Sequence, residues 1–331
     1  MRQLAAFVLV SVTAIGGIVA AQAPKARHNG VIALLEARQP VFGLYAPSNR
    51  RSPGASPASA PSAPKSPAEL AQEAAAYKSS DFVFDGSMEG DFEKAYPAFA
   101  EFAKGLAGAG ILSRTPHLHL THPMIVKAPE LQPNVLATQA AIGKQLNLGV
   151  SGVMLVTVET AAEARAGIAA MRFKSKGGVR PDDVGSAPAL WGMSEAEYRQ
   201  KADVWPLSPD GELINWTIVE SKTGLANLEE IAAVPGIGVL WPGAGTLRGV
   251  FSTTDASGKR VLDEAAWEGA VQQVLAACKA NKVACGFPAS AADIEMRMTQ
   301  GFNVFVMNWG EAGFKTVEAG RKVAGRTGST Q

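Results

Sequence analysis

The residues best suited to chemistry stand where apolar segments of the chain end. Glu220 closes the segment 213–219, Arg114 closes an earlier segment, and a glycine-rich stretch at 243–246 follows a later one. A carboxylate can hold a cation or accept a proton, and a guanidinium offers two parallel hydrogen bonds to a carboxylate at every working pH. Together these residue types indicate a polar site at the ends of the apolar segments.

The elements that must position these residues alternate regularly along the chain. Between residues 213 and 248, Leu225, Leu228 and Ile231 recur at helical spacing between two short apolar segments, which is a strand–helix–strand unit. Short apolar segments separated by helical patterns are typical of parallel strands buried on both faces. The expected strands are 40–46, 82–85, 111–114, 153–158, 213–219, 238–241, 283–287 and 304–307.

Eight such units predict an α/β protein with a single (β/α)8 TIM barrel over residues 22–331, and an open doubly wound sheet is the structural alternative. In either fold the carboxyl ends of the strands share one edge, where ligands bind. We therefore expect a common mouth for the polar residues that follow the strands. The residues expected there are Arg114, Glu220, Thr246, Phe287 and Asn308.

Glu220, the segment IGVLW and the loop PGAGTLR resemble the barrel core of the HpcH/HpaI aldolase and citrate lyase family. In that family the Glu and an Asp of the loop hold a divalent metal that chelates a 2-oxo acid. The resemblance implies that Glu220 is a ligand for Mg²⁺ or Mn²⁺, with Thr246 or Gly245 in the place of the Asp. Loss of one carboxylate is expected to weaken the binding of the cation, since such ions usually take one or two carboxylates.

The resemblance also implies how the substrate is held. The family Arg at the end of strand three binds the substrate carboxylate and carbonyl, and it stabilises the enolate that forms when a carbon–carbon bond breaks. Arg114 in ILSRTP matches that Arg. The pocket residues implied beside it are Gly243, Gly245, Thr246 and Asn308.

The chain departs from the family where strand two ends. The family has a D-x-E-H segment whose Asp and His act as general acid and base, whereas this chain has FVFDGSMEGDFE. Asp85 stands for the family Asp, and Met88, Glu89 or Gly90 takes the place of the His. Glu89 is then the candidate base.

Three histidines follow Arg114 in the segment HLHLTH. The sequence leaves three interpretations open: His117 brings an imidazole base to the mouth, His117, His119 and His122 bind Zn²⁺, or all three are ordinary loop residues.

A long connection, residues 172–211, interrupts the alternation. Its residues Arg172, Gly178 and Arg180 match a basic loop of the family. We expect this connection at the carboxyl edge of the barrel, in contact with the substrate or with a partner subunit.

Two segments lie outside the predicted core. Arg2, an apolar stretch and the small residues 19–21 predict a cleaved export signal over residues 1–21, and an uncleaved membrane anchor is the alternative that Gly16 and Gly17 disfavour. We therefore expect a periplasmic or secreted protein that is free of the membrane after cleavage. Residues 47–67, rich in Pro, Ser and Ala, predict a flexible loop after strand one, which acts as a spacer or a lid.

The composition of the chain further limits the class of protein to which it can belong. The chain has 331 residues, 47% of them hydrophobic, which is enough for one large core. A formal net charge of +1 gives no electrostatic case for nucleic-acid binding. Cys278 and Cys285 either form a disulfide in an oxidising compartment or are two small buried residues.

The sequence thus predicts a carbon–carbon lyase that acts on a small 2-oxo or hydroxy acid through an enolate. Arg114, Glu89, Asp85 and His117 are its candidate catalytic residues, and Glu220 is its metal ligand. The resemblance implies a homo-oligomer. The alternative is a barrel that has lost catalysis and binds a small carboxylate or serves as an assembly subunit.

Overall fold

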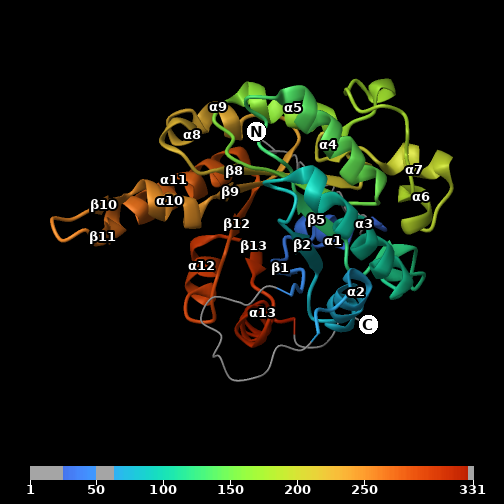
Figure 1. Ribbon diagram of the computed structural model, residues 1–331, viewed down its shortest axis with the longest axis horizontal. Coiled ribbons are helices and arrows are strands. Elements are labelled where there is room, and N and C mark those ends of the chain that lie inside the picture. Colours follow the sequence, from blue (N-terminus) through green and yellow to red (C-terminus); the bar gives the residue numbers. More distant parts are fainter. Residues whose placement is uncertain (1–24, 50–62, 327–331) are drawn as a thin grey trace, which may run out of the picture.

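The computed structural model describes residues 25–49 and 63–326, which form a closed ring of parallel strands surrounded by helices (Figure 1). The ring runs in the order β1, β2, β5, β6, β8, β9, β12, β13, and β13 pairs back to β1. This confirms the (β/α)8 barrel and excludes the open sheet. The barrel strands are β1 Val41–Tyr45, β2 Phe82–Asp85, β5 Met124–Lys127, β6 Gly152–Leu155, β8 Leu213–Val219, β9 Ile237–Pro242, β12 Ala284–Phe287 and β13 Val304–Met307.

Amphipathic helices cover the outer face of the ring. In α11, Trp267, Val271, Val274 and Cys278 recur every three or four residues and are buried, and the Asp263 side chain caps the first turn. The outer helices are α2 Pro67–Ala76, α3 Phe92–Gly108, α4 Val135–Asn147, α5 Ala161–Met171, α8 Lys222–Ala226, α9 Leu228–Ala232, α10 Ala244–Val250, α11 Glu264–Asn281, α12 Ile294–Gln300 and α13 Glu311–Val323.

The third barrel strand is β5, so the prediction of residues 111–114 for this strand was wrong. Leu112–Ser113 (β3) and His119–Leu120 (β4) instead form a two-stranded antiparallel sheet that precedes β5 in the chain. The strand β5 pairs with β2 on one side and β6 on the other, and Met124, Ile125 and Val126 are buried. Both segments are short and apolar, but only β5 continues directly into an outer helix.

The amino-terminal end of the barrel is closed by α1, Gly30–Glu36. Val31 and Ile32 are fully buried and pack with the side chains inside the ring. Asn29, which caps this helix, donates its backbone N–H to Glu212 Oε2 at 2.9 Å and its side-chain amide to the carbonyl of Glu212. Since Glu212 directly precedes β8, these bonds fix α1 beneath the strands.

Aromatic side chains fill the ring between this plug and the carboxyl edge. The Trp216 indole stacks on Trp241, with ring centroids 5.6 Å apart and an interplanar angle of 11°. Phe84 also stacks with the Trp216 indole, with ring centroids 5.9 Å apart, and Phe82 meets the same indole edge-on at 5.3 Å. Such pairs favour offset and edge-to-face geometry. The ring is therefore a packed core with an aromatic floor beneath its mouth.

The connection 172–211 lies at the amino-terminal end of the barrel, contrary to the prediction. It runs from the end of α5 to the start of β8, so it joins a helix to the beginning of a strand. Arg180 is buried there and donates to Asn147 Oδ1 at 2.8 Å and to the Tyr198 hydroxyl at 3.2 Å. The elements in this connection are η1 Lys174–Lys176, α6 Ala187–Leu190, α7 Glu195–Lys201 and β7 Val204–Trp205, which pairs with β8 outside the ring.

A hairpin that the sequence did not indicate projects from the barrel beyond α10 (Figure 1). It consists of β10 Ser252–Thr254 and β11 Arg260–Leu262, which pair antiparallel.

Cys278, in the last turn of α11, forms a disulfide with Cys285 of β12, with a Cα–Cα distance of 5.7 Å. The first of the two interpretations of these cysteines is therefore confirmed.

The predicted signal, residues 1–21, lies outside the described residues, as does most of the loop predicted at 47–67. Where this loop leaves and rejoins the described chain, Asn49 and Lys65 exchange two hydrogen bonds of 2.8 and 2.9 Å. Within the described parts of the chain, no helix combines the length and apolar character that a membrane crossing requires.

Candidate functional site

A cavity of about 420 Å³ opens at the carboxyl ends of the barrel strands. This is the edge at which TIM barrels place their active sites. Phe84, Ile218 and Trp241 form apolar parts of its wall, and several strand tips add polar groups. The polar side chains in the wall are Tyr45, Lys127, Glu220, Thr246, Ser290, Asp293 and Asn308.

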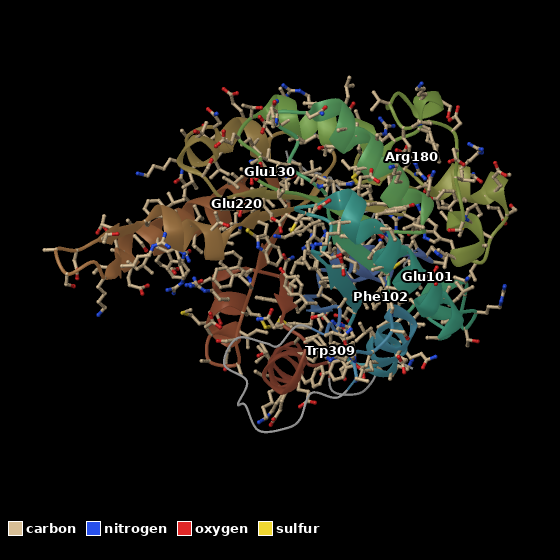
Figure 2. All side chains as sticks on the ribbon, in the orientation of Figure 1. Glu101, Phe102, Glu130, Arg180, Glu220 and Trp309 are labelled. Atoms are coloured by element: carbon tan, nitrogen blue, oxygen red, sulfur yellow. A yellow bond between two sulfur atoms is a disulfide. The ribbon has the colours of Figure 1, made fainter. Side chains whose placement is uncertain are left out.

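Glu220 lies directly after β8, where it was predicted, and is buried. Its Oε1 accepts hydrogen bonds from the Thr157 backbone N–H at 3.0 Å and from the Thr157 hydroxyl at 3.2 Å. The same hydroxyl lies 3.1 Å from Oε1 of Glu130, and Figure 2 labels both glutamates close to β8. Thr157 holds an unusual φ of 49°, a backbone conformation that β-branched residues rarely adopt. The structure thus uses a strained residue to fix the Glu220 carboxylate.

Gly243 makes room for that carboxylate. A Cβ atom added at Gly243 would lie 2.3 Å from Glu220 Cβ and 2.5 Å from Glu220 Oε2. Gly243, Gly245, Thr246 and Asn308 all line the cavity, as the sequence predicted for their positions. The glycine-rich loop therefore approaches Glu220 through backbone atoms.

Lys127 is the cationic side chain of the cavity wall, and sequence reasoning missed it. It is the last residue of β5, its side chain is 16% exposed, and its Nζ lies 2.8 Å from Glu89 Oε2. The signal was present in the sequence: the segment 124–127 ends in a cation and leads into the helix that begins at 135. Its strand was assigned to the wrong apolar segment, and the cation was lost with it.

Tyr45 is a second residue that the sequence did not indicate. It ends β1 and lines the cavity. Burial raises the pKa of the Tyr45 hydroxyl to about 12, and the negative charges of Glu89, Asp85 and Glu220 add to this effect. The phenol is therefore protonated at physiological pH and can donate a proton or a hydrogen bond into the cavity.

Arg114 does not reach this cavity. It follows β3 in the sheet that precedes β5, at the amino-terminal end of the ring, and it is exposed. The cause is topological, because a segment placed before a barrel strand meets the end where that strand begins. Arg114 is therefore not part of the site, and Lys127 occupies the tip of the third strand.

The histidines of the segment HLHLTH lie at the same distant end. His117 Nε2 is 3.0 Å from the Arg27 carbonyl oxygen, and His119 Nδ1 is 2.9 Å from the His117 carbonyl oxygen. His122 is buried between Thr121 and the Tyr77 carbonyl. In the part of the chain that the structure describes, no three His, Cys, Asp or Glu side chains are arranged to hold a metal ion. Neither an imidazole base at the mouth nor a Zn²⁺ site is formed.

The tip of β2 contributes through Glu89. Asp85 Oδ1 accepts a hydrogen bond of 2.8 Å from the Ser87 backbone N–H, so this carboxylate shapes its own turn. Met88 is fully buried and contacts the Gln145 amide through its sulfur. Glu89 reaches the site by its ion pair with Lys127.

The family resemblance implies a divalent cation, and the site residues do not fit one. Two carboxylates line the cavity, Glu220 and Asp293. Glu220 Oε1 already accepts two hydrogen bonds, and Asp293 Oδ1 accepts two from Ser290, at 2.6 and 2.7 Å. The glycine-rich loop offers only the Thr246 hydroxyl where a second carboxylate would be needed. No chemical step is therefore assigned to a metal ion.

The chain is similar to known proteins of one family. The family model described as HpcH/HpaI aldolase/citrate lyase matches residues 93–317. The hydroxypyruvate/pyruvate aldolase of Cupriavidus necator is 31% identical over 174 residues, which cover 51% of this chain and 61% of that protein. The 2-dehydro-3,6-dideoxy-6-sulfogluconate aldolase of Pseudomonas putida is 34% identical over 112 residues, which cover 32% and 38%. The matched segments thus span less than two thirds of either relative.

A solved structure of an HpcH/HpaI aldolase/citrate lyase family protein from Burkholderia cenocepacia superposes with a TM-score of 0.61. The two chains are 20% identical, and the match covers 85% of this chain and 92% of the other. At this identity the likeness shows a shared fold.

Proposed function

The chain belongs to the HpcH/HpaI aldolase/citrate lyase family, and from this premise we propose that it is a carbon–carbon lyase acting on a small 2-oxo acid. The aldolase names of the two relatives support this reaction class. The observation that carries the proposal is the meeting of Lys127, Tyr45 and Glu220 in one cavity at the carboxyl edge.

The cavity suits a small acid in size and in charge. Lys127 offers a positive charge to the carboxylate or the carbonyl oxygen of the ligand, and the largely buried position of its side chain strengthens this interaction. Thr246 and Asn308 offer a hydroxyl and an amide to the remaining oxygens. The aromatic and aliphatic wall formed by Phe84, Ile218 and Trp241 excludes water from the carbon chain.

Cleavage beside a 2-oxo group leaves an electron pair on the neighbouring carbon, and this pair delocalises onto the carbonyl. The positive charge of Lys127 stabilises that developing negative charge. The carbon on the far side of the breaking bond carries a hydroxyl, whose proton must be removed. Glu220 accepts this proton at Oε2, because its Oε1 is held by Thr157.

The test begins with the purified full chain. Isothermal titration with pyruvate and with oxaloacetate measures binding, and a coupled assay measures pyruvate released from a panel of 4-hydroxy-2-oxo acids. Binding of pyruvate together with its release from at least one panel member supports the proposal. A chain that binds pyruvate but cleaves no panel member would instead be the inactive, acid-binding barrel.

We also propose that the protein works in an oxidising compartment after export. The bond between Cys278 and Cys285 supports this, because structural disulfides persist mainly outside the reducing cytosol. The apolar leader at residues 1–21 supports it independently. Fusion of the first residues of the chain to a reporter enzyme that is active only outside the cytoplasm tests the idea, and a silent reporter would contradict it.

A further inference from the structure

Lys127 brings a primary amine into the cavity proposed to hold a 2-oxo acid. Its side chain is 16% exposed, and among the described residues that line the cavity it is the one with an amine. The apolar side chains of Phe84, Met154 and Ile218 line the same cavity. A lysine amine among apolar side chains, in a cavity proposed to hold a 2-oxo acid, is placed to act as a nucleophile and not only as a charge.

We infer that Lys127 is the covalent nucleophile of this site and condenses with the carbonyl carbon of a 2-oxo acid to form an imine. This inference deepens the proposed function and depends on the acid binding in the cavity. The residues around Glu220 do not provide a complete site for a metal ion that could activate the carbonyl. The inference assigns this activation to Lys127 instead.

Two neighbours supply the proton transfers that the condensation needs. Glu89 Oε2 lies 2.8 Å from Lys127 Nζ and accepts one proton from the ammonium, which frees the lone pair of the amine. Tyr45 flanks the lysine: a Cβ atom added at Gly86 would lie 3.4 Å from Lys127 Cδ and 3.5 Å from Tyr45 Cε1. The Tyr45 hydroxyl, whose pKa is raised to about 12, is protonated and can donate to the carbonyl oxygen under attack.

The step balances without an oxidant or a reductant. The amine nitrogen bonds to the carbonyl carbon, and the π electrons move to the oxygen, which takes a proton from Tyr45. The nitrogen, which now carries a positive charge, gives a proton back to the Tyr45 phenolate and regains its lone pair. A second proton, returned through Glu89, then converts the hydroxyl into water. Water leaves as the nitrogen lone pair forms the C=N bond. In sum, an ammonium and a ketone give a protonated imine and one water molecule.

The protonated imine then receives the electrons of the breaking carbon–carbon bond. These electrons form an enamine on Lys127, while Glu220 takes the hydroxyl proton of the fragment that leaves as an aldehyde. Protonation of the enamine carbon restores the imine, and water hydrolyses it to release the acid and the lysine. A protonated imine accepts electrons more readily than a ketone, so the lysine supplies the stabilisation that a bound cation would supply elsewhere.

Reductive trapping tests the inference directly. The full chain is incubated with pyruvate and sodium borohydride, with and without prior treatment with a chelator, and its intact mass and peptide map are measured. We expect a mass gain equal to pyruvic acid less one oxygen atom, located on Lys127 and unaffected by the chelator. Lys144 is the matched internal control, because its amine also pairs with a glutamate, Glu93 at 2.9 Å, but on the surface. It should remain unmodified.

Lys127→Arg separates the covalent role from the electrostatic one. Arginine keeps the positive charge but cannot form the imine, so this variant should bind pyruvate, show no adduct and lose the cleavage activity. Lys144→Arg should match the wild type in all three measurements. Thermal unfolding of both variants checks that they fold, and trapping on the wild-type chain stands independently of either.

Each other outcome overturns the inference. An adduct on a different lysine, or undiminished cleavage by Lys127→Arg, would show that Lys127 is not the nucleophile. Pyruvate binding without any adduct would overturn the covalent role and leave the proposed function in place. Absence of both binding and adduct would overturn the proposed function as well.

Discussion

Arg114 and Glu220 stand at opposite ends of the same barrel. Glu220 follows β8 at the carboxyl edge, whereas Arg114 lies in the antiparallel sheet that precedes β5. An acid-binding pocket that uses both residues does not exist in this fold. The cation that shares the cavity with Glu220 is Lys127, which ends β5.

This placement predicts opposite results for two substitutions. Lys127→Ala should weaken pyruvate binding by roughly 10- to 100-fold, because a charged hydrogen bond contributes on the order of 1.5–3 kcal/mol. Arg114→Ala should bind pyruvate as the wild type does, since Arg114 is exposed at the far end. Isothermal titration of both variants measures the difference. Loss of binding in Arg114→Ala alone would contradict the site described here.

Gly243→Ala should impair the site by steric pressure on one carboxylate. The added methyl group would lie 2.3 Å from Glu220 Cβ, so Glu220 must shift away from Thr157 or the loop must move. Overpacking of this kind costs about 1–3 kcal/mol of stability. Cleavage activity should fall by more than the loss of folded protein explains. Gly245→Ala is the control, because no atom lies within 4 Å of a Cβ added there.

Stability should fall as the pH is lowered from about 6.5 to about 4, owing to His28. This histidine directly precedes Asn29, the cap of α1, and is buried against Trp191, with ring centroids 4.8 Å apart. Burial, aided by the charge of Lys201, lowers the pKa of its imidazole from 6.5 to about 4. The unfolded chain therefore binds a proton in this range that the folded chain does not, so the free energy of unfolding rises with pH.

Between pH 6.5 and pH 4, His28 changes the free energy of unfolding by about 3 kcal/mol. This contribution is fully present above pH 6.5 and is lost by pH 4. Chemical denaturation of the wild type and of His28→Phe at several pH values isolates the contribution of His28. All other groups titrate in both proteins, so their effects cancel in the difference. The difference in unfolding free energy between the two proteins should change by about this amount. A constant difference would show that His28 does not titrate as described.

Reduction of the Cys278–Cys285 bond should lower stability modestly. The two residues are seven positions apart, so the bond closes a short loop and removes little entropy from the unfolded chain. We expect a loss on the order of 2 kcal/mol. Thermal unfolding with and without a reductant measures it, and the double variant Cys278→Ala, Cys285→Ala should no longer respond to the reductant. The cavity lies elsewhere, so pyruvate binding by the folded protein should persist.

Much of the architecture follows from local pattern. Apolar segments of four to seven residues, separated by helical periodicity, predict buried parallel strands, and seven of the eight predicted barrel strands overlap those observed. The rule that parallel strands align their carboxyl ends was enough to place Glu220, Thr246 and Asn308 on one cavity. Capping of α7 by Ser194 and Glu197 follows from residues three apart.

Tertiary structure alone decided which of two apolar segments became the third strand. The segments 111–114 and 124–127 are similar in length and character, and the choice depends on pairing with β2 and β6, which lie far away in the sequence. That pairing sent Arg114 to one end of the barrel and Lys127 to the other. Strand pairing is a nonlocal interaction, whereas periodicity is local. For this reason the sequence by itself determined that a barrel forms and where Glu220 stands, and only the closed ring determined which cation faces it.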